Sequence, residues 1–252
     1  MDNNKGFTLN DDSWEIQDGL LINYNGEDSV VIIPPGVTEI DVSAIMFEEA
    51  IETIIVPDTV KKIGYAAFDA LPSLKTLYLP DNGAQLSNSF INGCTNLKEV
   101  YLGEQKLEFV TATDEDDKEF KHLVTYVGGK SDVVVPDGYR YIDDGAFRRN
   151  EAINSVALPQ SVVHIDALVF DGCVNLGKLN LPENLLVISY KAFAGCTKIK
   201  ELFIPAGTIY IGEEAFLNWT ESQTIRMPSR FKKPFKFMQK WRKKCKAQII
   251  YY

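Results

Sequence analysis

A repeat of 23 residues constrains this sequence more than any other feature. Prolines recur at that interval in two blocks along the chain. They are Pro34, Pro57 and Pro80 in the first block and Pro136, Pro159, Pro182, Pro205 and Pro228 in the second. Self-similarity at a period of about 20 to 50 residues is typical of solenoids, in which each coil packs only on its neighbours. The chain is therefore predicted to be a stack of coils.

Each repeat has the pattern of a strand followed by a return limb. The positions one and three before each proline are apolar, as at Leu77 and Leu79, and this alternation indicates a strand with one face inward. An isoleucine such as Ile63 and an Ala-Phe pair such as Ala67-Phe68 then mark the return limb. We expect a right-handed, β-rich solenoid with a parallel sheet and coils about 4.8 Å apart.

The rhythm breaks once, between Gly103 and Pro136, where the acidic run 114–119 is inserted. After it, the sequence of residues 123–128 resembles that of residues 21–26. The chain therefore contains two copies of one arrangement, in which an opening segment is followed by repeats. We expect one continuous stack with five parts. They are a hairpin cap over 1–29, a first repeat block over 30–103, an acidic insert with a re-entrant hairpin over 104–131, a second block over 132–229 and a basic helical cap over 230–252.

The repeat resembles a known family. The run from Asn175 to Thr197 fits the pattern LxxIxLPxxVxxIxxxAFxGCxxL, and the likeness extends over about residues 20 to 252. It is similar to the leucine-rich repeats of the BspA type, also called Treponema-type repeats. The resemblance implies a leucine-rich-repeat superhelix with a binding role. It also implies kinship with bacterial surface proteins, many of them adhesive.

Charge is unevenly distributed along the chain. The formal net charge is −9, yet residues 226–246 contain ten Lys and Arg and no acid. The remainder has 16 basic and 35 acidic residues, a charge of −19. Such an acidic body argues against tight nucleic-acid binding.

The first residues show no targeting signal. They lack the basic and apolar regions of a signal peptide, and no apolar run approaches the roughly 18 residues of a membrane-spanning helix. These features favour a cytoplasmic location, and the family resemblance keeps the cell surface open.

Four cysteines do not form a disulfide framework. Cys94, Cys173 and Cys196 occupy one phase of the repeat, which favours a packing role as buried thiols. A bridge between Cys173 and Cys196, in adjacent coils, remains the alternative.

The column two residues before each proline is the main candidate binding site. Alternation points it outward, where polar residues are usual, yet it is rich in aromatic and aliphatic side chains. Its candidate residues are Ile32, Ile55, Tyr78, Tyr101, Val134, Phe203 and Arg226, with Ala157 and Asn180 between them. An apolar stripe with a polar margin predicts a docking face for a protein, anchored by Tyr78, Tyr101 and Phe203. The alternative is that these side chains stack along neighbouring strands and stabilise the sheet.

The basic end has two interpretations. Phe231, Phe235, Met238, Trp241 and Cys245 fall at steps of three and four residues, so a helix could seal the last coil with this face. The alternative is binding of an anionic surface, either nucleic acid or acidic lipid. The residues for this alternative are Lys232, Lys233, Lys236, Lys240, Arg242, Lys243 and Lys244.

No catalytic or metal-binding pattern is found. The acidic run 114–119 lacks the spacing of a calcium loop, and His122 and His164 lie in different repeats without a zinc-type cluster. There is no G-x-S-x-G nucleophile motif and no Gly-rich phosphate loop. We therefore expect a protein without enzymatic activity, cofactor, metal or small-molecule substrate.

Overall fold

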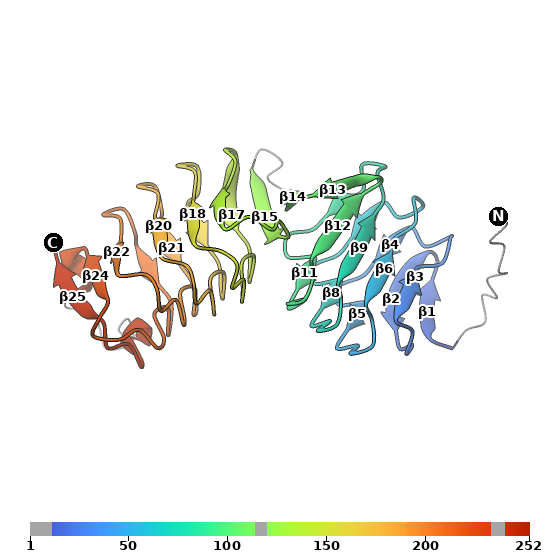
Figure 1. Ribbon diagram of the computed structural model, residues 1–252. Coiled ribbons are helices and arrows are strands. Elements are labelled where there is room, and N and C mark those ends of the chain that lie inside the picture. Colours follow the sequence, from blue (N-terminus) through green and yellow to red (C-terminus); the bar gives the residue numbers. More distant parts are fainter. Residues whose placement is uncertain (1–11, 114–119, 233–239) are drawn as a thin grey trace. The chain divides into compact units, whose positions relative to one another are not determined.

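The computed structural model describes residues 12–113, 120–232 and 240–252. The chain divides into two compact units, Met1–Glu108 and Phe109–Tyr252. Figure 1 shows strands of successive coils lying side by side within each unit. The predicted β-rich solenoid with parallel sheets and coils of 23 residues is confirmed. The finer boundaries expected from the sequence stay a prediction.

The first unit has a sheet on each of three sides. The front sheet has the order β13-β12-β9-β6-β3, with bounds Gln105–Leu107, Glu99–Leu102, Thr76–Leu79, Thr53–Ile55 and Val30–Ile32. The second has the order β1-β2-β4-β7-β10, with bounds Trp14–Gln17, Leu20–Tyr24, Glu39–Ile40, Lys62–Ile63 and Gln85–Leu86. The third has the order β11-β8-β5, with bounds Ile91–Asn92, Phe68–Asp69 and Ile45–Met46. Antiparallel hairpins, β1–β2 and β12–β13, stand at the two ends of the unit.

The second unit repeats this plan with turns on its third side. One sheet has the order β14-β15-β17-β19-β21-β23, with bounds Phe109–Thr113, Lys121–Tyr126, Tyr139–Ile142, His164–Ile165, Val187–Ile188 and Tyr210–Ile211. The front of this unit holds β16-β18-β20, bounded by Asp132–Val134, Ser155–Ala157 and Lys178–Asn180, and β22-β24-β25, bounded by Glu201–Phe203, Thr224–Met227 and Gln248–Tyr251. On the third side the turns still bond from coil to coil, since Phe147 N donates to Val169 O at 3.0 Å.

The alternation predicted for the front strands places apolar side chains in the core. Val31, Ile54, Leu77 and Val100 lie beside one another in the register of the front sheet and are at most 1% exposed. Prolines follow the first three of these strands at the corner where the chain leaves the sheet, a place that suits a residue without an N–H donor, and Gly103 follows the fourth. Each coil thus contributes one layer to a continuous apolar interior.

A column of phenylalanine rings runs through the second unit. Phe147, Phe170, Phe193 and Phe216 are buried, with successive ring centroids 5.2, 5.6 and 5.9 Å apart and ring planes within 12°. Tyr126 packs on the first of these rings, at 5.5 Å, and Trp241 meets the last one edge-on, at 6.0 Å. Aromatic residues therefore close both ends of the column where the repeat itself stops.

The two residues of each Gly-Cys pair have different structural roles, a backbone turn at the glycine and a hydrogen bond from the cysteine. Gly172 and Gly195 have φ values of +75° and +71°, a conformation that side chains with a Cβ rarely adopt. The thiols of Cys173 and Cys196 donate to the carbonyls of Phe147 and Phe170 at 3.0 and 3.1 Å.

In the next coil, Trp219 takes the position of these cysteines, and its Nε1 donates to Phe193 O at 2.8 Å. The residue at this position thus satisfies a buried carbonyl of the preceding coil. All four cysteines are free, and burial raises the pKa of Cys173 to about 12. Cys173 and Cys196 are the buried thiols expected from the sequence, whereas Cys94 is only partly buried.

Helical structure is minor. The described part of the basic end contains the 3₁₀ helix η1, Ser229–Phe231, and helical residues at 240–242. Phe235 and Met238 of the predicted helix lie outside the described residues. Among the described residues, no helix has the length and apolar character needed to cross a membrane.

Truncation of a ring inside the phenylalanine column tests this view of the core. Phe193→Ala is expected to lower the free energy of unfolding by about 3–5 kcal/mol, because it leaves a cavity between two stacked rings. The matched change Phe47→Ala, at a side chain that is 68% exposed, is expected to cost under about 0.5 kcal/mol. Urea unfolding followed by circular dichroism measures both. Equal losses would contradict the assignment of the column as core.

Candidate functional site

The outward column of the front sheet is continuous in the first unit. The strand register places Ile32 beside Ile55, Ile55 beside Tyr78, and Tyr78 beside Tyr101. Ile32 is 44% exposed and Tyr78 is 37% exposed, whereas Ile55 and Tyr101 are partly buried. Strands β3, β6, β9 and β12 lie side by side in the front sheet (Figure 1). Their register therefore lines up these aliphatic and aromatic side chains in one unbroken row.

Two tyrosines at one end of this row hold each other in place. The rings of Tyr78 and Tyr101 stack at a centroid distance of 4.9 Å and an interplanar angle of 13°. The Tyr101 hydroxyl donates to Glu99 Oε2 at 3.3 Å, and Lys106 Nζ lies 2.6 Å from Glu99 Oε1. The hydrogen bond and charge of Lys106 hold the pKa of Glu99 below its usual range, so this carboxylate accepts both bonds at neutral pH. Two fixed rings cost little side-chain entropy when a partner covers them.

Val30 belongs to the same surface and was missed in the sequence. It is 51% exposed, and its backbone pairs with Thr53 at the start of strand β6. It stands four residues before Pro34, in the column that is otherwise polar at Thr53, Thr76 and Glu99. That single apolar exception was the available signal. We define the front stripe as Val30, Ile32, Ile55, Tyr78 and Tyr101.

The candidate residues of the second unit do not form such a row. Val134 is 72% exposed, but Ala157 and Asn180 follow it in the register. Phe203 stacks on Tyr252 at a centroid distance of 4.7 Å. Arg226 Nε forms an ion pair with Glu201 Oε1. These residues lie on strands of the second unit, so the structure groups them separately from the front stripe.

Part of the basic end is engaged within the chain. Lys243 Nζ lies 2.9 Å from Glu214 and 3.3 Å from Glu213, and Lys240 Nζ lies 3.6 Å from Glu213. Trp241, between these lysines, is 1% exposed. These contacts attach the basic end to the last coil.

The remaining basic residues divide into two groups. Lys232, Arg242 and Lys244 are exposed. Lys233 and Lys236 lie outside the described residues.

His164 does not have the geometry of a Ser-His-acid triad. Nε2 of His164 lies 3.1 Å from Ser189 Oγ and 3.0 Å from Asp166 Oδ1. A Ser-His-acid triad needs the serine and the carboxylate on opposite ring nitrogens, and here both meet the same one.

His122 is buried, with Nδ1 2.8 Å from Asp143 Oδ1, and its ring stacks on Tyr141 at 4.4 Å. Among the described residues, no three His, Cys, Asp or Glu side chains lie close enough together to hold a metal ion.

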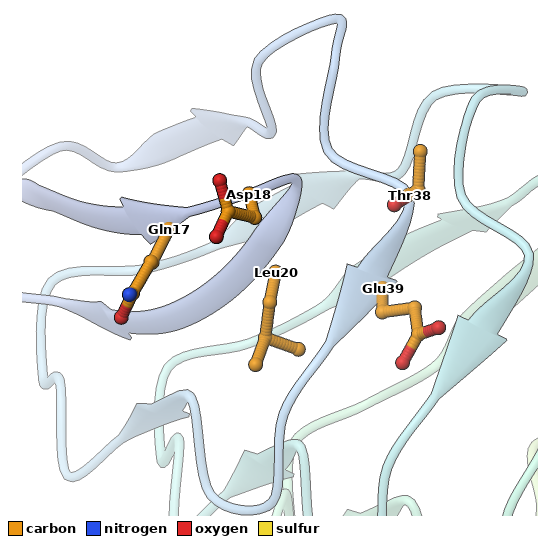
Figure 2. Close-up of a pocket in the computed structure, with 5 residues that line it drawn as sticks. All are labelled: Gln17, Asp18, Leu20, Thr38 and Glu39. Carbon is orange, nitrogen blue, oxygen red and sulfur yellow. The ribbon is translucent and has the colours of Figure 1, made fainter.

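An open hollow of about 290 Å³ lies beside the first hairpin. Gln17, Asp18, Leu20, Thr38 and Glu39 line it, and Figure 2 shows the carboxylates of Asp18 and Glu39 pointing in different directions. The hollow lacks the convergent polar groups and apolar walls of a small-molecule site.

Comparison with known proteins identifies the repeat. Residues 21–112 and 127–236 match the family described as the BspA type leucine rich repeat region, in six copies. A search of curated protein sequences gives no significant match.

Three solved structures share the fold. A leucine rich cell surface protein from Faecalibacterium prausnitzii is 23% identical with a TM-score of 0.73, and the match covers 88% of this chain and 59% of that one. The pneumococcal vaccine antigen PcpA is 19% identical with a TM-score of 0.58, covering 79% and 62%. A leucine-rich repeat protein from Bacteroides ovatus is 20% identical with a TM-score of 0.54, covering 98% and 68%. The chain thus spans about 60% of the length of the first two relatives.

The ion pairs of the basic end predict a specific acid sensitivity. Lys243 holds the pKa of Glu214 below its usual value of 4.5, so the stabilisation is present above about pH 4.5 and is lost as the pH falls further. Glu214→Gln is therefore expected to be less stable than the wild type at pH 7, and this difference should shrink below about pH 4.5. Urea unfolding across the pH range measures it, with Glu221→Gln, at an exposed site, as the control. A difference that stays constant down to pH 3 would contradict the role of Glu214.

Proposed function

Because the chain belongs to the BspA-type leucine-rich repeat family, we propose that it is a non-catalytic interaction module that docks a protein partner on the front stripe. The observation that carries the proposal is the unbroken outward row from Val30 to Tyr101 on four neighbouring strands, in which Val30, Ile32 and Tyr78 are exposed and the other two residues are partly buried. Outward positions of a solvated sheet are normally polar, and contiguous exposed apolar area is typical of interaction sites.

The composition of the front stripe fits a protein interface. Tyrosine is enriched among the residues that dominate binding energy, because its ring buries a large area with few rotatable bonds. Thr53, Thr76 and Glu99 form a polar margin beside the row, and interfaces commonly have an apolar centre with a polar rim. Tyr78 and Tyr101 are the proposed anchors, and Ile32, Ile55 and Val30 extend the apolar surface from them.

The absence of catalysis is part of the same proposal. Both contacts of His164 fall on one ring nitrogen, which leaves no activated nucleophile at Ser189. The side chains around the hollow at the first hairpin do not converge on a common point. Over the part of the chain that the structure describes, such a surface suits binding of a partner through a large contact area rather than catalysis.

Loss of the tyrosine pair tests the proposal. Tyr78→Ala/Tyr101→Ala is expected to lower affinity for the partner by at least about tenfold, because truncated anchors typically cost over 1 kcal/mol each. The measurement is quantitative capture from source-cell extracts by immobilised wild type and variant. Tyr190→Ala/Tyr210→Ala removes two tyrosines of the second unit that are 42% and 52% exposed, and it is the matched control.

A protein lost only with the Tyr78/Tyr101 variant supports the front stripe as its docking face. Equal recovery with all three baits would contradict it. Separate cytosolic and envelope extracts also test where the module acts, since a cytoplasmic and a surface location predict the partner in different fractions.

A further inference from the structure

A row of carboxylates borders the front stripe where the strands end. Asp58 and Asp81 each follow the proline of their coil, and Glu104 lies in the two-residue turn between β12 and β13. All three are exposed. A Cβ added to Gly103 would lie 3.0 Å from the Cβ of Asp81, so this turn directly adjoins the aspartate of the preceding coil. We call these three residues the acidic row.

The carboxylates of the acidic row have no cationic partner among the described residues, and Lys61 Nζ, which lies beside Asp58, donates to its backbone O at 3.2 Å. The ion pairs of this face are Lys75 with Glu52 and Lys106 with Glu99, both 2.6 Å long, and they lie at the opposite margin, where the strands begin. No ion pair among the described residues includes a member of the acidic row. Like charges on successive coils about 4.8 Å apart repel one another, and cations of a bound molecule would relieve that repulsion.

The charge of the whole first unit has the same sign. Residues 1–108 contain 18 acidic and six basic side chains. A long-range field of this sign attracts cationic molecules and disfavours nucleic acid and anionic lipid at this face.

We propose, on the basis of the proposed function, that the partner of the front stripe is a basic protein segment that alternates cationic and apolar side chains. Its apolar side chains cover the row from Val30 to Tyr101, and its Lys or Arg side chains reach the acidic row. An extended segment presents its apolar and cationic side chains in two separate rows, because successive side chains point to opposite sides of its backbone. The stripe supplies contact area, and the acidic row selects the sign of the partner's charge.

Synthetic peptides test the proposal directly. One peptide alternates lysine with phenylalanine, a second alternates glutamate with phenylalanine, and a third alternates lysine with serine. Calorimetric titration of the full chain is expected to show the tightest binding for the lysine–phenylalanine peptide, with affinity that falls as salt rises. Tighter or equal binding of either other peptide would overturn the proposal.

Two triple variants separate the acidic row from general attraction to an acidic protein. Asp58→Asn/Asp81→Asn/Glu104→Gln is expected to lower the affinity for the lysine–phenylalanine peptide about tenfold, because three exposed charge pairs are lost. The affinity should then also depend less on the salt concentration. Glu15→Gln/Asp18→Asn/Glu39→Gln removes the same charge from exposed sites on β1, on β4 and in the turn between β1 and β2, and we expect less than about a twofold change. Equal weakening by both variants, at matched unfolding midpoints, would overturn the proposal.

The failure of this inference is distinguishable from failure of the docking face itself. If the glutamate–phenylalanine peptide binds best, and Tyr78→Ala/Tyr101→Ala abolishes that binding, the front stripe remains a docking face and the basic partner is wrong. A second copy of this chain is the other candidate occupant, since residues 226–246 are strongly basic. Self-association in sedimentation experiments that the acidic-row variant abolishes would replace the separate partner and so overturn the proposal.

Discussion

The hydrogen-bond register between coils is the constraint on which the rest of the structure depends. On the three sides of the first unit, Val56 N donates to Tyr78 O at 2.9 Å, Lys61 N to Thr38 O at 2.7 Å and Phe68 N to Phe90 O at 3.0 Å. Within the regular coils, this register places a strand residue beside the one 23 positions away. A residue type repeated in the sequence therefore becomes a column in space. Inward columns form the core, and outward columns form surfaces. Each coil contributes one residue to each column, so the residue types at that position determine whether the surface is apolar, polar or charged.

The two faces of the front strands have different roles, because the inward face stabilises the fold and the outward face is available to a partner. Leu77 and Val100 are fully buried, while their neighbours Tyr78 and Tyr101 point outward and stack on each other. Only the inward residues lose all contact with water on folding, so they carry the larger share of stability. The outward residues gain a modest stacking energy and keep part of their surface accessible to a partner, since Tyr78 is 37% exposed and Tyr101 is partly buried. This difference explains how a surface rich in tyrosine and isoleucine is compatible with a stable solenoid.

Features that recur with the period could be predicted, whereas features that occur once could not. The proline spacing was enough to predict the parallel strands, the buried columns and the outward position of Ile32 and Tyr78. It could not predict the stacking of Phe203 on Tyr252, since that contact joins the last coil to a segment outside the repeat. Phe47 is another exception, because the Phe68 column continues through Ile45 and leaves Phe47 exposed with a φ of +60°. The ion pairs of Glu214 likewise depend on how the basic end folds back.

The free energy of unfolding of two double variants is the most direct test of this division between faces. Tyr78→Ala/Tyr101→Ala removes the outward pair, and Leu77→Ala/Val100→Ala removes the inward pair one residue away on the same two strands. If the outward face serves recognition, the first variant should lose about 1 kcal/mol or less and the second at least about 4 kcal/mol. Comparable losses would show that the front stripe stabilises the sheet, and would contradict its role as a docking face.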